Sequence, residues 1–180
     1  MNAGQHQDLD ERAARIRLLA LDVDGVLTDG RLWFDQTGNE LKAFYTRDGL
    51  GLKALLRFGV AVALITGRTS RMVDDRAAQL GIQHVYQGRD DKLNALEELM
   101  SETGVEAGDI CYVGDDWIDL PVLERVGLSV SPSDAAPLVR ERVHWVTAAK
   151  GGLGAVREVC DFILAAQGHD QQLMRELLDR

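Results

Sequence analysis

Two carboxylates separated by one residue, Asp22 and Asp24, follow directly after an apolar run at residues 18–21. If that run is a strand, its period of two places both carboxylates on one side and Val23 on the other. One carboxylate could attack phosphorus and form an aspartyl-phosphate, while the other protonates the leaving oxygen and then activates water. Gly25 permits the tight turn that follows. A plain strand-end turn, where Asp and Gly are common, explains this motif equally well when it is taken alone.

A second acidic cluster, containing Asp115, Asp116 and Asp119, follows another apolar run. The spacing of four residues predicts Asp115 and Asp119 on one face of a helical turn, where like charges destabilise unless a cation offsets them. Mg²⁺ takes one or two carboxylates, several waters and an oxygen of a substrate phosphate. Helix capping explains one of these aspartates well and three poorly. The cluster therefore predicts a magnesium site.

Two further elements suit a phosphate group. Thr66, Gly67 and Arg68 follow an apolar run, and a hydroxyl with backbone N–H groups at the start of a helix can hold a phosphate. Lys92 opens a later helical pattern, from which its ammonium could neutralise charge on a nucleophile and on a transferring phosphoryl group. Taken alone, a threonine N-cap and a solvated lysine are the ordinary interpretations of these residues.

The elements that would position these residues alternate along the chain. The expected strands are residues 18–21, 60–65, 84–86, 110–113, 128–130 and 144–146. The expected helices are residues 49–58, 69–80, 91–103, 119–126, 134–142 and 153–166. Apolar strands separated by helices indicate an α/β fold, a three-layer Rossmann-like parallel sheet with helices on both faces. The polar residues named above should then meet in the crevice at the carboxyl ends of the strands.

One segment, residues 31–44, breaks the alternation. Its two β-prone arms surround residues 35–39, which predicts a β-hairpin inserted after the first strand. An isolated hairpin is marginal in water, and its open edges invite pairing. Because Leu32, Trp33 and Phe34 are consecutive, alternation cannot hide all three on one face. We therefore expect the hairpins of several copies to pack together, the alternative being that the aromatic residues join the core of their own domain.

Composition narrows the class of protein. The 180 residues fit a single domain, and 46% hydrophobic residues suffice for a core. The net charge of −9 with no basic run argues against a nucleic-acid-binding protein. Cys111 and Cys160 are expected to be reduced core residues, and the scattered histidines give no zinc motif. With no secretory signal and no run of about 18 apolar residues, we expect a cytoplasmic protein without a membrane span, ending in a loosely held tail over residues 169–180.

The ordered set D-x-D-G-x-L-T-D, T-G-R, Lys and G-D-D-x-x-D resembles the haloacid dehalogenase superfamily of phosphohydrolases. The resemblance implies Mg²⁺ as the cofactor. It implies the following roles: Asp22 as nucleophile, Asp24 as acid/base, Thr66 and Lys92 as phosphoryl-binding residues, Asp22, Asp115 and the Asp24 carbonyl as metal ligands, and Asp116 and Asp119 as residues that position the metal ligands. Residues 24–47 leave room only for the hairpin, and residues 66–92 only for one helix and one short strand. A capless member, with no cap domain, is therefore expected.

Within this superfamily, residues 46–49, 65–68, 86–88 and 151–160 resemble the 3-deoxy-D-manno-octulosonate 8-phosphate phosphatases, which release phosphate in making the lipopolysaccharide sugar Kdo and are typically homotetramers. The resemblance implies a sugar-acid phosphate as substrate and a homotetramer as the assembly. It implies a substrate site formed by Arg47, Asp48, Gly49, Gly67 and Arg68. Leu153 departs from the family pattern, which commonly has Arg in the glycine-rich run. Phosphatases of related nine-carbon sugar acids share most of these motifs and are the alternative.

Two other classes of protein are less consistent with the order of the motifs. A phospho-accepting receiver domain also combines Asp, Mg²⁺, Thr and Lys, but there the acidic pair follows the first strand and the acceptor Asp comes later. A nucleotide-binding module is suggested by residues 151–154, which lack the full G-x-G-x-x-G spacing. Asp24 supplies an acid/base that a stable phospho-switch would lack, so the hydrolase is the prediction.

Overall fold

A six-stranded parallel sheet forms the centre of the computed structural model, which describes residues 3–179. Its order is β5-β4-β1-β6-β7-β8. The strands are β1 (Leu18–Leu21), β4 (Ala61–Ile65), β5 (His84–Tyr86), β6 (Ile110–Val113), β7 (Leu128–Ser131) and β8 (Trp145–Val146). Each lies within one residue of the bounds expected from the sequence. The first strand of the chain is thus central, and the strand order reverses beside it, which places a ligand crevice at its carboxyl end.

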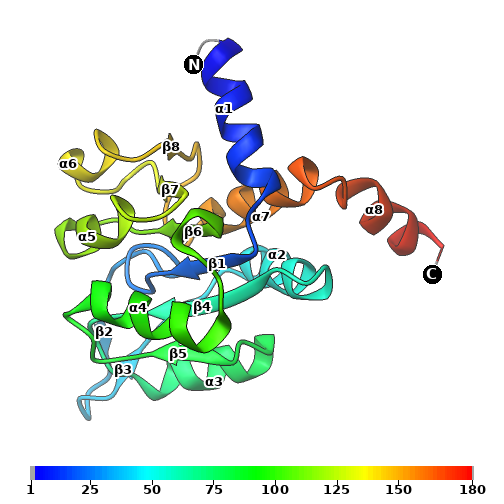
Figure 1. Cartoon of the computed structure of the whole chain (residues 1–180). Coiled ribbons are helices and arrows are strands. Elements are labelled where there is room, and N and C mark those ends of the chain that lie inside the picture. The colour runs from blue at the N-terminus through cyan, green and yellow to red at the C-terminus, as the bar shows by residue number, and fades with distance from the viewer. Residues whose placement is uncertain (1–2, 180) are drawn as a thin grey trace.

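Helices cover both faces of the sheet (Figure 1). The first face packs against α1 (Ala3–Ala14), α2 (Thr46–Arg57), α3 (Arg71–Leu80) and α7 (Ala155–Ala166), and the second against α4 (Lys92–Thr103), α5 (Leu120–Leu123) and α6 (Pro137–Arg140). In β1, Leu19 and Leu21 join the first core while Leu18 and Ala20 join the second, and all four are fully buried. The predicted three-layer α/β fold is confirmed.

Two helices are shorter than the sequence predicts, because proline and glycine residues fix where they begin. The helix expected over residues 134–142 is only α6, because Pro137 has no N–H to donate and suits the first helical position. α7 begins two residues late because Gly154 is left-handed, with φ 108°. α1 was not predicted at all. Its polar sequence offers few apolar positions, yet Leu9 and Ala13 are buried in the first core.

The predicted hairpin is present as a separate antiparallel pair, β2 (Trp33–Phe34) and β3 (Glu40–Leu41). Asp35 closes its turn, because Asp35 Oδ1 accepts hydrogen bonds from Thr37 N and Asn39 N. In Figure 1 the hairpin protrudes at the lower left, away from α1 and α8 (Asp170–Leu178). Trp33 and Phe34 are 55% and 60% exposed, so they are not part of the core of their own domain.

The segment that the sequence suggests as a tail contains α8. His169, which precedes it, stacks on Phe58, the residue after α2, with ring centroids 4.5 Å apart. Glu176 forms an ion pair with Arg57, and Leu173 packs against the first core. Within residues 3–179, none of the helices has the length and apolar character that crossing a membrane requires.

Candidate active site

The carboxyl ends of β1, β4 and β6 bring the predicted residues to one edge of the sheet. Leu21 is in register with Leu64 of β4 and with Val113 of β6, so the chain leaves all three strands at the same level. A cavity of about 340 Å³ opens there. Its lining residues are Asp22, Asp24, Gly30, Thr66, Gly67, Arg68, Asp90, Asp115, Asp116 and Ile118. Seven of the predicted site residues therefore surround one space.

Asp22 is buried in the floor of this cavity and is held from two sides. Asp22 Oδ1 accepts a hydrogen bond from Val23 N at 2.7 Å, and Oδ2 lies 2.9 Å from Lys92 Nζ. Burial, and then the nearby Asp119 carboxylate, raise the pKa of Asp22, while Lys92 opposes the rise. These two contacts fix the orientation of the Asp22 carboxylate at the cavity.

Lys92, at the first position of α4, is 1% exposed and bridges two carboxylates. Its Nζ donates to Asp119 Oδ1 at 2.7 Å as well as contacting Asp22. Burial disfavours the charge, but Asp22 and Asp119 together outweigh it, and the pKa of Lys92 is raised. Lys92 is therefore an ammonium at neutral pH, placed beside the Asp22 carboxylate.

Asp119 is completely buried and accepts four hydrogen bonds. Its Oδ1 accepts from Lys92 Nζ and Tyr112 OH, both at 2.7 Å, and its Oδ2 accepts from Asp115 N at 3.0 Å and Asp116 N at 3.1 Å. The sequence predicts Asp115 and Asp119 on one face of a helical turn. That prediction is wrong, because the 3-10 turn η2 (Trp117–Asp119) begins only after Asp115. Asp119 instead reaches back to the loop and fixes it. The side chain of Asp116 caps η2 by accepting from Trp117 N at 2.8 Å.

The Asp115 carboxyl group has no ion-pair partner among the described residues. Carboxylate oxygens of Asp22, Asp115 and Asp119 lie within 4.8 Å of one another. Asp115 Oδ1 is buried without a hydrogen-bond partner in residues 3–179. Burial, followed by the charge of Asp22, raises the pKa of Asp115 to about 8. An oxygen donor set with an unpaired buried oxygen fits a hard divalent cation such as Mg²⁺. Asp119 already accepts four hydrogen bonds, whereas Asp22 accepts one from Val23 N and contacts Lys92, so Asp22 and Asp115 are the better ligands.

Asp24 lies on the other side of the cavity and contacts the hairpin segment. Lys42 Nζ is 2.5 Å from Asp24 Oδ1, and Thr28 Oγ1 is 3.3 Å from the same oxygen. Arg68 Nε lies 3.6 Å from Asp24 Oδ2, and Arg68 Nη2 donates to Glu40 Oε1 at 3.0 Å. Sequence reasoning missed Lys42 and Glu40. The available signal was that both lie on the same side of the second hairpin arm, two residues apart.

The Thr66–Arg68 segment differs from the predicted helix N-terminus. Thr66 follows β4 and is buried, but α3 starts only at Arg71, after Ser70. The five residues 66–70 form a loop, in which Arg68 N donates to Thr66 Oγ1 at 3.4 Å. A phosphate bound here would meet the hydroxyl and loop N–H groups, not a helix dipole.

Three predicted substrate-binding residues, Arg47, Asp48 and Gly49, do not line this cavity. They belong to the first turn of α2. Asp48 is 1% exposed, and its Oδ1 accepts from Arg157 N of α7 at 2.8 Å, which ties the two helices together. Burial raises the pKa of Asp48 to about 6, against the backbone hydrogen bonds from Arg157 and Gly154.

The glycine-rich run supports the loop after β1. A Cβ at Gly151 would lie 1.7 Å from Gly25 O, and one at Gly152 would lie 2.4 Å from the carbonyl carbon of Thr28. Gly152 N donates to Val26 O at 2.9 Å. Only glycine allows this approach, so the run is a packing element here. Leu153 between these glycines and α7 is 59% exposed.

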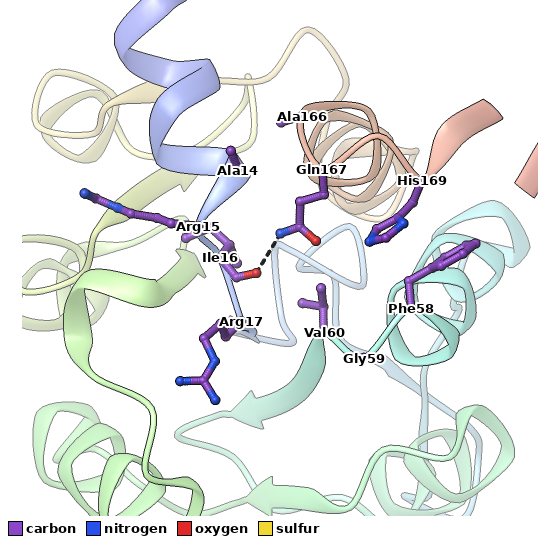
Figure 2. Close-up of a pocket in the computed structure, with 10 residues that line it drawn as sticks. All are labelled: Ala14, Arg15, Ile16, Arg17, Phe58, Gly59, Val60, Ala166, Gln167 and His169. Carbon is purple, nitrogen blue, oxygen red and sulfur yellow. Dashed lines mark hydrogen bonds between the residues drawn. The ribbon is translucent and has the colours of Figure 1, made fainter. Parts of the chain in front are cut away.

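A larger cavity of about 540 Å³ lies at the amino ends of β1 and β4, among residues 14–17, 58–60, 166, 167 and 169 (Figure 2). Gln167 Nε2 donates to Ile16 O at 2.7 Å beside it. In Figure 2 the side chains of Arg15 and Arg17 point in different directions and do not converge on one point. None of the predicted site residues lines this cavity, so the chemistry belongs to the opposite edge.

Comparisons with known proteins agree with this site. A family model of haloacid dehalogenase-like hydrolases matches residues 81–158. The chain is 52% identical over 160 residues to the 3-deoxy-D-manno-octulosonate 8-phosphate phosphatase of Yersinia pestis. The aligned region covers 89% of this chain and 86% of that protein. The crystal structure of the Yersinia pestis enzyme matches with a TM-score of 0.90 at 51% identity, over 91% of this chain and 89% of that one. The Moraxella catarrhalis phosphatase of the same name, crystallised with a magnesium ion, a phosphate ion and a KDO molecule, matches with a TM-score of 0.93 at 43% identity, over 95% and 98%.

Proposed function

This chain belongs to the haloacid dehalogenase-like hydrolases, within their 3-deoxy-D-manno-octulosonate 8-phosphate phosphatases, and we propose that Asp22 is its nucleophile. The protein is a phosphoric monoester hydrolase that converts 3-deoxy-D-manno-octulosonate 8-phosphate into Kdo and phosphate, a step of lipopolysaccharide biosynthesis, with Mg²⁺ as cofactor. The observation that carries the assignment of residues is the buried contact between Asp22 and Lys92 beneath the cavity.

The chain divides the reaction into two displacements. An Asp22 carboxylate oxygen attacks phosphorus, the ester P–O bond breaks, and the ester oxygen takes a proton from the Asp24 carboxyl group. A water oxygen then attacks phosphorus of the aspartyl-phosphate, Asp24 takes the proton of that water, and the Asp22 carboxylate leaves. Lys92 and Thr66 hold the phosphoryl oxygens, where a fixed donor stabilises charge that grows in the transition state.

The carboxylates of Asp22 and Asp115, with the backbone carbonyl of Asp24, would hold Mg²⁺. When bound, the cation offsets the negative charge of the carboxylates and of the phosphoryl group. Asp116 and Asp119 support this set indirectly, because Asp119 fixes the backbone N–H groups of residues 115 and 116. The orphaned Oδ1 of Asp115 gains a partner in this arrangement.

Arg68 is the substrate-recognition candidate at the cavity itself. Its side chain is 46% exposed while contacting Glu40, so a guanidinium remains available for the carboxylate of a sugar acid. Gly67 lines the cavity beside it. We propose that Arg47, Asp48 and Gly49 also belong to the substrate site, as the resemblance to the family implies. Asp48 would act through the α2–α7 contact, since its carboxylate is buried there.

The direct test is an Asp22→Asn variant, assayed for phosphate release with Mg²⁺ and a set of sugar-acid phosphates. The amide cannot form the aspartyl-phosphate, so turnover should vanish while the fold remains. Asp10→Asn, on the exposed side of α1, is the matched control and should behave as wild type. Substantial turnover by purified Asp22→Asn would refute the assignment of Asp22 as the nucleophile. Preference for a nine-carbon sugar-acid phosphate would instead change the assigned substrate.

We further propose that the protein is a homotetramer assembled through its hairpins. Leu32, Trp33, Phe34 and Leu41 are 45–60% exposed, an apolar surface carried on a two-stranded element that has no third strand among the described residues. Packing the same surface from other copies against it would bury these side chains. It would also wall an otherwise open cavity.

A cytoplasmic location is the remaining inference. Cys111 and Cys160 are both buried and neither forms a disulfide within the described part of the chain. Thiols kept in this form suit a reducing compartment. Localisation by fractionation of cells that make the protein would test it.

A further inference from the structure

Lys42 is a lysine of the hairpin segment whose side chain is buried against Asp24, a residue that lines the active-site cavity. It follows β3 directly, and only 1% of its side chain is exposed. Its Nζ lies 2.5 Å from Asp24 Oδ1 and 3.2 Å from Glu40 Oε1. A buried ammonium between two carboxylates makes charge-assisted hydrogen bonds that are stronger and better defined than those of a solvated surface pair.

The two oxygens of Asp24 are therefore in different environments. Oδ1 is occupied by Lys42 and by Thr28 Oγ1 at 3.3 Å. Oδ2 is buried without a hydrogen-bond partner within residues 3–179, and its nearest cation, Arg68 Nε, is 3.6 Å away. A carboxyl group that exchanges a proton with substrate needs one oxygen left unoccupied and directed at the reacting atom.

We propose that Lys42 is a positioning residue for the acid/base. It holds Asp24 Oδ1, so that Oδ2 is the oxygen that gives a proton to the ester oxygen and later takes one from water. This inference rests on the proposed function, because Lys42 has this task only if Asp24 is the acid/base.

A direct contact between Lys42 and substrate is the competing explanation, and the geometry disfavours it. Two of the three ammonium donors are already directed at Asp24 and Glu40, and the side chain is nearly inaccessible. Glu40 is held in turn by Arg68 Nη2 at 3.0 Å. Lys42 is thus fixed by a network on the protein side.

The test compares two substrates whose leaving groups differ in their need for protonation by a general acid. A sugar alkoxide leaves only when its oxygen is protonated, whereas 2,4-dinitrophenolate leaves without a proton. The second step, attack of water on the aspartyl-phosphate, needs the base for both substrates. Rapid-quench measurements with 3-deoxy-D-manno-octulosonate 8-phosphate and with 2,4-dinitrophenyl phosphate therefore separate the two tasks of Asp24.

For Lys42→Met we expect the first step with the sugar phosphate to slow by about 10- to 100-fold, part of what a general acid contributes. The first step with the dinitrophenyl ester should change by less than about threefold, and a burst of dinitrophenolate should reveal accumulated phosphoenzyme. Lys42→Arg, which keeps the charge, should recover most of the rate. Lys53→Met on the exposed side of α2 is the matched control and should show wild-type values.

Two results would overturn the proposal. Equal losses with both substrates in the first step would mean that Lys42 is merely structural. A raised KM for the sugar phosphate, with its saturated first-step rate unchanged, would mean that Lys42 binds substrate. If Lys42→Met does not fold, Lys42→Gln serves instead, because the ratio of the two first-step rates does not depend on the active fraction. Failure of the wild-type protein to turn over either ester would refute the proposed function rather than the role of Lys42.

Discussion

Replacing Asp119 by asparagine removes the charge that anchors Lys92 from below while changing almost nothing in size. The wild-type carboxylate accepts from Lys92 Nζ, Tyr112 OH and the N–H groups of Asp115 and Asp116. Asparagine can keep the two backbone hydrogen bonds if its oxygen faces them. Its NH₂ group then faces the other two partners.

The cost follows from what those two partners can do. The hydroxyl of Tyr112 can rotate and accept from the amide, but the ammonium of Lys92 has donors only. One charge-assisted hydrogen bond is therefore lost, worth about 1.5–3 kcal/mol, and breaking a buried ion pair outright costs about 3–5 kcal/mol. Because Lys92 keeps Asp22 as a partner, we expect Asp119→Asn to lower the free energy of unfolding by about 2–4 kcal/mol.

Urea denaturation at one fixed protein concentration, with EDTA present, measures this difference without a contribution from bound metal. Asp10→Asn is the surface control and should unfold like wild type. With Mg²⁺ restored, Asp119→Asn should also lose about ten- to a hundredfold in kcat, because Lys92 has lost one of its two anchors. A variant within about 0.5 kcal/mol of wild type would refute the view that Lys92 depends on Asp119.

Three further outcomes are expected. The pKa of Asp115 is raised from 3.8 to about 8, so between these values the folded metal-free protein binds more protons than the unfolded chain and loses stability as pH rises. Mg²⁺ needs the ionised carboxylate, so the Tm gain on adding Mg²⁺ over EDTA should be larger at about pH 8 than at about pH 5.5, and an equal gain would contradict the assignment. Lys92→Ala or Thr66→Ala should each lose on the order of 10²–10³ in kcat with Mg²⁺ saturating, whereas a change in KM alone would disagree with their role. A variant with Trp33 and Phe34 both replaced by Ser should sediment as a smaller species than wild type, and an unchanged tetramer would exclude the hairpin as the assembly element.

The strands, and the edge of the sheet at which the predicted site residues gather, could be predicted from the sequence, because both depend on local patterns. A fully apolar strand between helices is buried on both faces, as in a parallel sheet covered by helices. Residues at the carboxyl ends of such strands then lie at the same edge of the sheet. Asp22, Thr66 and Asp115 meet for this reason, although they lie far apart in the chain.

The contacts made by side chains from different elements could not be predicted in the same way. Lys42 reaches Asp24 across 18 positions because of how the hairpin folds over the loop after β1, which no local pattern reveals. The hydrogen bond from Arg157 N to Asp48 spans 109 positions and depends on how α2 crosses α7. α1 was not predicted for a related reason. Its few apolar residues are buried only because they pack in the same core as α7, which lies far away in the sequence.

The central position of β1 has a consequence for the order in which the chain can become active. This strand is made before its two sheet neighbours, β4 and β6, and the loop that follows it packs against Gly151 and Gly152, which are made later still. Such long-range pairing is slow to form. A nascent chain or a proteolytic fragment that ends before these glycines already contains Asp22, Lys92 and Asp115, but lacks the surface that shapes the Asp22 loop. Hydrolytic activity should therefore begin only after Gly151 and Gly152 have been synthesised and packed against this loop.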